Sequence, residues 1–298
     1  MNVTHLIQCQ EAVSKPAIDN TKDYLSQSLI LLGIVSVIFA AAPDLDLIVS
    51  RLFWNPRSGF ELNNNSSLIA FRDVNRVLPW ALIAIAVVLL IPNPLLRRFR
   101  RPPAPHKLLF MITFLAVGPG LSVHLIKMLV SRARPRALEE FGGTAIFTPP
   151  WELTDQCVRN CSFISGEAAS AFALLVLVVF VQRRYFSVYL MASGALAAAF
   201  SLTRVLHGAH FLSDVIIAWN VMLIIALLLW RIFSQNAPQI DAIFAADNCT
   251  SRSGGPYRIK EQSRLLLRQR CNRVPIHPER DRLPSLWFAR LTLRASGT

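Results

Sequence analysis

Three short polar clusters carry the residue types and spacings that could do chemistry. They read KMLVSRARP at residues 127–135, SFISGE at 162–167 and RVLHGAHFLSD at 204–214. Each cluster borders a long apolar run. Charged side chains beside membrane-length apolar runs are costly to keep, so they indicate a functional site.

The cations in these clusters indicate a site for phosphate. Lys127, Arg134 and Arg204 can converge on one dianionic group, because arginine forks match phosphate oxygens. Ser165 and Gly166 stand at the start of the fourth apolar run, and the N–H groups at a helix N-terminus bind phosphate.

His210 and Asp214 supply a nucleophile and its partner. They are four residues apart, so on a helix they share a face. The carboxylate can hold the imidazole in one tautomer and stabilise its charged form, which makes the histidine a usable nucleophile toward phosphorus. Phosphoryl transfer depends mainly on positioning and charge stabilisation, so no metal or other cofactor is expected.

Six apolar segments must position these clusters. They cover residues 28–43, 77–92, 108–126, 164–182, 186–203 and 211–233. In lipid, only helices and closed barrels satisfy the hydrogen bonds of their backbone groups. Runs this apolar rarely recur six times in a soluble α-bundle. The sequence therefore predicts an all-α, polytopic membrane protein with six transmembrane helices, the third of them kinked at Gly118-Pro119-Gly120.

Lys and Arg predict the orientation of these helices. With a cytoplasmic N-terminus, the basic turns at 93–107 and 183–185 lie inside, as the positive-inside rule favours. Residues 1–27 are then a cytoplasmic segment, 28–233 the membrane domain and 234–298 a basic cytoplasmic tail. All three polar clusters fall on the outer face, because the third and fifth helices end there.

The formal net charge is +13, but no Lys/Arg run is interleaved with aromatic residues, so nucleic acid is not an expected partner. The five cysteines include no Cys-x-x-Cys pair, so no zinc site is expected. Cys157 and Cys161 lie in one outer loop and can form a disulfide in an oxidising compartment if that loop turns sharply.

The clusters resemble the motifs of the type 2 phosphatidic acid phosphatase superfamily. Its pattern is Lys, six residues, Arg-Pro; then Pro-Ser-Gly-His; then Ser-Arg, five residues, His, three residues, Asp. The first and third parts match, with Thr203 in place of Ser, at Lys127, Arg134, Pro135, Arg204, His210 and Asp214. Residues 44–63 are also similar to the first outer loop of the bacterial lipid A and prenyl-phosphate branch.

The resemblance implies a role for each matching residue. His210 would attack phosphorus and form a phosphohistidine, and Asp214 would orient it. The phosphoryl oxygens would be held by Lys127, Arg134, Arg204, Ser165 and Gly166.

The second part of the pattern is altered. Ile164 replaces the Pro, and Glu167 replaces the His that would protonate the leaving alkoxide. We expect Glu167 to act as general acid once burial or a bound phosphate dianion favours its protonated form. His207 is an alternative acid. A Glu167 that only pairs with an arginine would instead indicate an inactive relative.

We therefore expect a metal-independent phosphatase that hydrolyses a lipid phosphomonoester or pyrophosphate at the periplasmic face of a bacterial inner membrane. Candidate substrates are lipid A, undecaprenyl pyrophosphate and phosphatidylglycerophosphate, and the branch resemblance alone favours lipid A. The alternatives are a lipid phosphotransferase with the same intermediate and a lipid-phosphate-binding protein that has lost turnover. The sequence does not define the oligomeric state.

Overall fold

The structure is a computed structural model that describes the backbone of residues 3–91 and 103–250 and the side chains of 21–91 and 103–244. Residues 92–102 lie outside the described residues and include most of the predicted basic turn at 93–107. Residues 251–298 also lie outside them and include most of the predicted tail at 234–298. Residues Leu25–Phe233 form one compact unit, which contains all three polar clusters.

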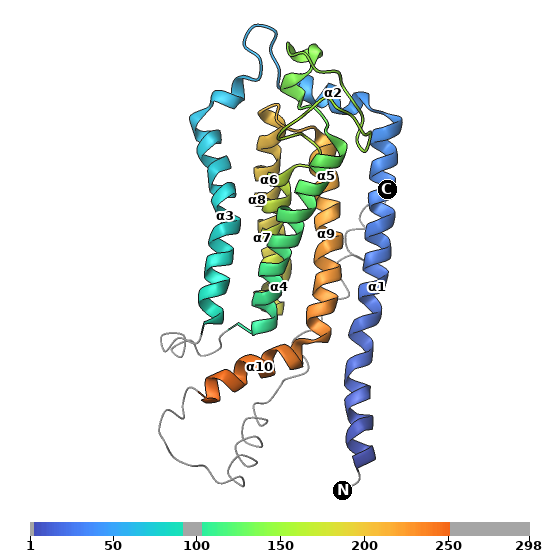
Figure 1. The fold of residues 1–298 in the computed structure, drawn as a ribbon, viewed down its shortest axis with the longest axis vertical. Helices are drawn as coiled ribbons and strands as arrows, with labels where there is room; N and C mark the ends of the chain where they lie inside the picture. The colour runs from blue at the N-terminus through green and yellow to red at the C-terminus, as the bar shows by residue number, and fades with distance from the viewer. Residues whose placement is uncertain (1–2, 92–102, 251–298) are drawn as a thin grey trace. The chain divides into compact units, whose positions relative to one another are not determined.

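The described residues form helices and loops without a strand, and five of the helices are long and apolar enough to cross a membrane (Figure 1). These are α1 (Val3–Ala41), α3 (Ser66–Leu90), an interrupted helix made of α4 (Pro105–Leu115) and α5 (Val123–Val130), α8 (Phe186–Leu206) and α9 (Leu212–Gln235). The prediction of an all-α, multi-pass membrane protein is confirmed.

The fourth predicted segment forms a shorter apolar helix, Gly166–Phe180. It consists of α6 (Gly166–Ala171), α7 (Ala173–Val176) and a 3-10 turn at Leu177–Phe180. A straight span needs ~20 residues, so this helix is short for the bilayer. It packs against α3 and α8, and its alanines are fully buried, which allows the helices to approach closely.

The helices at the two ends of the predicted membrane domain continue beyond its bounds. Helix α1 is continuous from Val3 to Ala41, so the predicted boundary between residues 27 and 28 falls inside it. Hydropathy marks where a helix leaves lipid, but it does not mark where the helix ends. Within the predicted tail, Ala237–Thr250 form α10.

The predicted irregularity of the third helix is confirmed as a π-helical turn at Ala116–Ser122. Pro119 lies inside this turn and has no N–H to donate. A Cβ on Gly118 would lie 2.9 Å from the sulfur of Met222, so the glycine allows α9 to approach. The turn therefore sets the path of α5, whose last turn carries Lys127.

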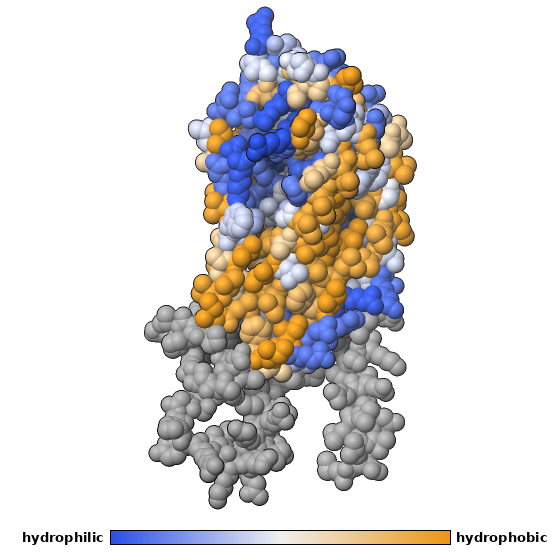
Figure 2. All heavy atoms as spheres, viewed as in Figure 1, coloured by the Kyte–Doolittle hydropathy of each residue, from blue (hydrophilic) through white to orange (hydrophobic). Residues whose placement is uncertain are grey.

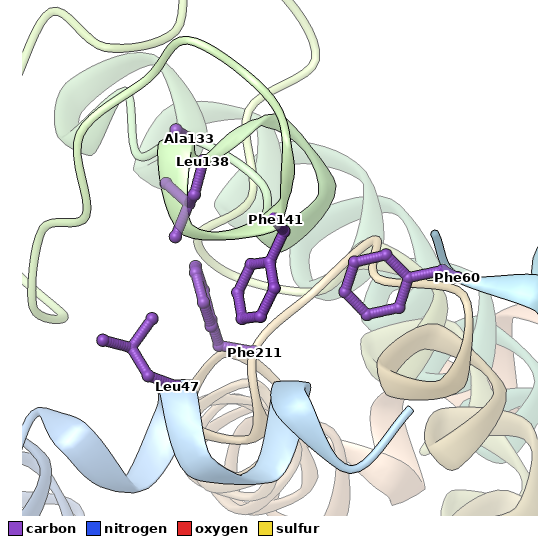
Figure 3. Close-up of a cluster of buried hydrophobic side chains, with 6 residues drawn as sticks. All are labelled: Leu47, Phe60, Ala133, Leu138, Phe141 and Phe211. Atoms are coloured by element: carbon purple, nitrogen blue, oxygen red, sulfur yellow. The ribbon is translucent and has the colours of Figure 1, made fainter. Parts of the chain in front are cut away.

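Polar residues gather at the end of the bundle that carries α2 (Asp44–Arg51), next to a broad apolar surface (Figure 2). The loops at this end are held by a cluster of buried side chains (Figure 3). The cluster consists of Leu47, Phe60, Ala133, Leu138, Phe141 and Phe211. It joins α2 to the loop after α5 and to the start of α9, so it fixes the segments that carry the polar clusters.

Gly208 lies against this cluster and tests the fold around the site. Its φ is +57°, and a Cβ there would lie 2.5 Å from the ring of Phe60. We expect Gly208→Ala to lower the free energy of unfolding by about 1–3 kcal/mol, because the added methyl group overpacks a buried contact. Thermal denaturation of the detergent-purified protein measures this change.

Gly33→Ala is the matched control, because a Cβ on Gly33 meets nothing within 4 Å. Equal melting temperatures for the two variants would contradict this account of Gly208.

Candidate active site

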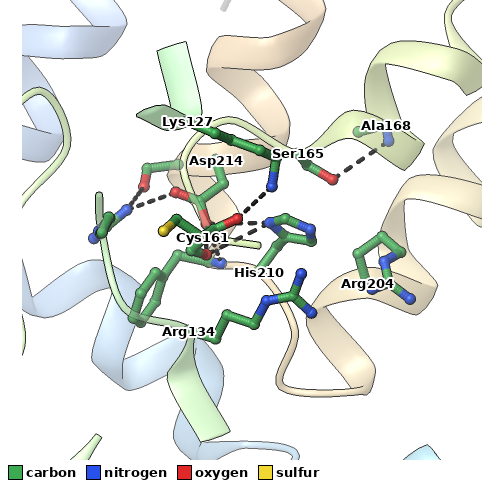
Figure 4. A network of polar contacts seen from close by, with 12 residues as sticks. Lys127, Arg134, Cys161, Ser165, Ala168, Arg204, His210 and Asp214 are labelled. Atoms are coloured by element: carbon green, nitrogen blue, oxygen red, sulfur yellow. Dashed lines mark hydrogen bonds and ion pairs between the residues drawn. The ribbon is translucent and has the colours of Figure 1, made fainter. Parts of the chain in front are cut away.

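The structure brings the predicted phosphate-binding and catalytic side chains together at the polar end of the bundle (Figure 4). Lys127, Arg134 and Arg204 are arranged around His210 in this view. The predicted site residues are carried by five segments of the chain: the last turn of α5, the segment before Pro135, the N-terminus of α6, the last turn of α8 and the segment that leads into α9.

His210 and Asp214 form the centre of the site, and both are buried. The Nδ1 of His210 lies 3.6 Å from Oδ2 of Asp214 and 3.5 Å from Oγ of Ser162. The hydroxyl of Ser162 donates to the same Oδ2, and the N–H of Phe211 donates to it over 2.9 Å. These acceptors favour a proton on Nδ1, which leaves the lone pair of Nε2 free for attack.

The surroundings keep His210 neutral. Burial lowers the pKa of His210 from 6.5 to about 3, and the nearby Lys127 acts in the same direction, while Asp214 opposes the change. A neutral imidazole is the form that can act as a nucleophile. At neutral pH, burial therefore favours the form of the ring that the predicted nucleophilic role requires.

Arg132 holds the other side of Asp214. Its Nη1 donates to Oδ1 of Asp214 over 2.7 Å, and its Nη2 donates to Oδ2 of Asp46 over 2.9 Å. Its Nε donates to the carbonyl of Thr148 over 2.7 Å, and its guanidinium lies over the ring of Phe211 at 4.1 Å. The side chains of Asp46, Arg132 and Asp214 have no exposed surface.

Two of the predicted phosphate ligands are held by the loop that the cysteines close. Cys157 and Cys161 form a disulfide, and the left-handed φ of +59° at Asn160 supplies the sharp turn. Arg134 donates to the carbonyl and the side-chain oxygen of Asn160 over 2.9 and 2.7 Å, and Lys127 donates to the carbonyl of Cys161. Both cations retain N–H groups for a ligand.

Ser165 and Gly166 stand where the fourth helix begins. The Oγ of Ser165 caps α6 by accepting from the N–H of Ala168 over 3.3 Å. Its own N–H donates to the carbonyl of Asp214 over 3.2 Å, which ties this helix start to α9. A Cβ on Gly166 would lie 3.3 Å from Val123 of α5, so the glycine allows close approach of the two helices.

Glu167 lies between two arginines. Its Oε1 accepts from the Nε of Arg76 over 3.0 Å, and its Oε2 lies 3.2 Å from the Nε of Arg204, an ion pair that is not aligned as a hydrogen bond. The pairing with arginine that was the alternative to a general acid is therefore present. In this arrangement Glu167 is placed as an acceptor.

His207 is buried beside these residues. Neither of its ring nitrogens has a hydrogen-bond partner among the described residues. Burial lowers its pKa, and the charge of Arg204 lowers it further. This disfavours the charged ring that an acid would need, so Glu167 is the better candidate.

The sequence analysis did not predict four residues that the structure places at the site: Asp46, Ser162, Arg132 and Arg76. Two signals could have found some of them. Arg132 is a further cation in the middle of the first cluster, and Ser162 is the first residue of the second cluster. The partners of Asp46 and Arg76 are 86 and 91 residues away, a distance that no local pattern bridges.

Comparison with known proteins agrees with the geometry. Residues 106–238 match the family model of the PAP2 superfamily. A lipid A 4'-phosphatase of Rhizobium leguminosarum is 32% identical over 206 residues, which cover 63% of this chain and 87% of the relative. The chain belongs to the PAP2 superfamily of phosphatases.

A lipid A 4'-phosphatase of Francisella tularensis subsp. novicida and one solved structure are also similar to this chain. The first is 29% identical over 195 residues, which cover 63% of this chain and 87% of the relative. The second is a transmembrane PAP2-type phosphatidylglycerolphosphate phosphatase from Bacillus subtilis, with 16% identity and a TM-score of 0.49 over 69% of this chain and 93% of its own.

The low pKa of His210 predicts the pH at which its ring takes up a proton. Nitrogen-15 NMR of histidine-labelled protein, with His210→Ala for assignment, should show a neutral His210 ring from pH 8 to about 4. Because the folded protein resists this proton and the unfolded chain accepts it, His210 should cost stability as the pH falls from 6.5 toward 3. A ring that titrates near 6.5 would contradict the burial argument.

Proposed function

We propose that this protein is a metal-independent lipid phosphatase that works through a phosphohistidine at His210. One observation carries the proposal: three cationic side chains surround an imidazole whose other face is turned to a buried carboxylate. The cations suit the oxygens of a phosphate, and the carboxylate suits the positive charge that develops on the ring.

In the first step, the lone pair on Nε2 of His210 attacks phosphorus. An N–P bond forms and the P–O bond to the lipid breaks, so its electron pair goes to the leaving oxygen. Lys127, Arg134 and Arg204 stabilise the equatorial oxygens. Asp214 stabilises the ring, which keeps its Nδ1 proton and becomes cationic, and the 3.6 Å separation in the free site shortens as that charge develops.

Glu167 supplies the proton for the leaving oxygen. A phosphate dianion competes with Glu167 for Arg204, and it places a like charge beside the carboxylate. Both effects weaken the pairing that keeps Glu167 an acceptor of the Arg204 charge. The arginine pair of the free site is therefore compatible with an acid that forms only when substrate is bound.

The second step releases phosphate. Glu167, now ionised, accepts a proton from a water molecule whose oxygen attacks phosphorus. The N–P bond breaks, its electron pair returns to Nε2, and inorganic phosphate leaves with His210 neutral again. The acid of the first step is thus the base of the second, as reversal of the same proton path requires.

The substrate we propose is the phosphomonoester of lipid A, as the names of the two lipid A 4'-phosphatases suggest. A phosphate in the headgroup plane reaches a site at the end of apolar helices, where polar residues gather (Figure 2). We place this end at the periplasmic face of a bacterial inner membrane, with both termini cytoplasmic, on the distribution of Lys and Arg.

A panel of lipid phosphates tests the function. Detergent-purified wild type should release phosphate from lipid A faster than from undecaprenyl pyrophosphate or phosphatidylglycerophosphate. EDTA should not change the rate, because the cations of the site are side chains. His210→Ala should reduce release to background, because it removes the nucleophile. Release that persists in His210→Ala, or none from any lipid between pH 4 and 8, would contradict the proposal.

The role of Glu167 is tested by the leaving group. With lipid A, whose leaving group is an alkoxide, Glu167→Gln should lower kcat about 10²–10⁴-fold, the contribution typical of a general acid. With an aryl phosphate such as p-nitrophenyl phosphate, whose leaving group needs no proton, the loss should be much smaller.

Glu140→Gln is the control, because it makes the same change at an exposed carboxylate outside the proposed machinery. Equal losses of Glu167→Gln on the two substrates would mean that Glu167 only positions Arg204.

A further inference from the structure

A row of three buried charges lies behind the nucleophile. The guanidinium of Arg132 spans Asp46 on α2 and Asp214 on α9, with N···O distances of 2.9 and 2.7 Å. Asp46 also receives the N–H of Ser213 over 2.9 Å and the hydroxyl of the same residue. The first turn of α9, which carries Asp214, is therefore bound to α2 through Asp46 as well as through Arg132.

The contacts of both carboxylates suit their ionised forms. Asp46 receives Arg132 and the N–H of Ser213, and the hydroxyl of Ser213, which accepts from Nη1 of Arg132 over 2.9 Å, donates to it as well. Burial raises the pKa of Asp46, while Arg132 opposes the rise. Asp214 likewise receives donors only, from Arg132, Ser162 and the N–H of Phe211.

The charges of this row do not cancel. One guanidinium and two carboxylates leave a net charge of −1. If Arg132 had Asp214 as its single anionic partner, its positive charge would weaken the field of Asp214 at His210. Because the second carboxylate compensates Arg132, Asp214 retains its charge for the imidazole.

We propose that Asp46 is a positioning residue for the phosphatase reaction, which compensates Arg132 so that Asp214 can orient His210 and stabilise the charge of its phosphorylated ring. The proposal rests on the function proposed above. Asp46 and Arg132 touch neither His210 nor the three phosphate-binding cations in any described contact, so they act through Asp214.

This role predicts which kinetic constant changes. The positive charge on the ring develops in the transition state and is absent in the substrate complex, so a weaker field from Asp214 lowers kcat. Substrate is held by Lys127, Arg134 and Arg204, which Asp46 does not contact, so KM should change little.

Asp46→Asn tests the role, because it keeps the volume of the side chain and removes its charge. We expect kcat with lipid A to fall about 10–100-fold, the range typical of residues that orient a reacting group through another, with KM within about twofold of wild type. Asp44→Asn is the matched control: Asp44 lies in the same helix turn and is exposed. It should keep the wild-type kcat.

A second measurement, the tautomer of His210, does not depend on catalytic activity. In the nitrogen-15 spectrum, wild type and Asp44→Asn should show His210 with its proton on Nδ1, and Asp46→Asn should show a mixture of both tautomers. Should Asp46→Asn fail to fold, Arg132→Lys replaces it, because one ammonium group cannot span both carboxylates, and it should show the same mixture and a lower kcat.

The outcomes separate the two proposals. Wild-type kcat and a wild-type His210 signal in Asp46→Asn would overturn the role of Asp46, while an inactive His210→Ala would leave the phosphatase function intact. A lower melting temperature with unchanged kcat per folded molecule and an unchanged tautomer would also overturn it. If wild type releases no phosphate from any lipid, the function fails, and the tautomer alone decides whether Asp46 orients His210.

Discussion

The arrangement of the site depends on the burial of Arg132 between Asp46 and Asp214. A buried charge without a partner costs several kcal/mol, so each of these three side chains requires the others. Together they join α2, the loop after α5 and the start of α9, three segments that are far apart in the sequence. The same contacts decide which oxygen of Asp214 faces His210, since Arg132 takes Oδ1 and leaves Oδ2. The same three side chains thus stabilise the fold at this end of the bundle and orient the carboxylate that faces His210.

The cations that would hold phosphate have protein partners in the free site. Lys127 and Arg134 donate to oxygen atoms of the disulfide-closed loop, and Arg204 pairs with Glu167. These partners keep the cations in place without a ligand and limit the cost of burying like charges together. A phosphate dianion offers more charge than a carbonyl or one carboxylate, so it can compete for all three. The same competition would separate Arg204 from Glu167, as the proposed role of Glu167 requires.

Much of this arrangement could be predicted from the sequence. The spacing of His210 and Asp214, and the count of apolar segments, were enough to place the polar clusters at one end of a helical bundle. Hydropathy could not show that α1 extends back from residue 28 to Val3, or that the fourth helix is short, because helix length also depends on neighbouring helices. The partners of Arg132 and Glu167 on α2 and α3 were missed because they are tertiary contacts between distant segments.

The most direct test of the account is chemical trapping of the intermediate. Wild-type protein mixed with lipid A labelled with phosphorus-32 is quenched in alkali within milliseconds, digested and analysed by mass spectrometry. The account predicts a label that is stable in alkali, labile in acid and attached to His210, and that is absent from His210→Ala. Phosphate release without any labelled histidine, or a label on another residue, would contradict it.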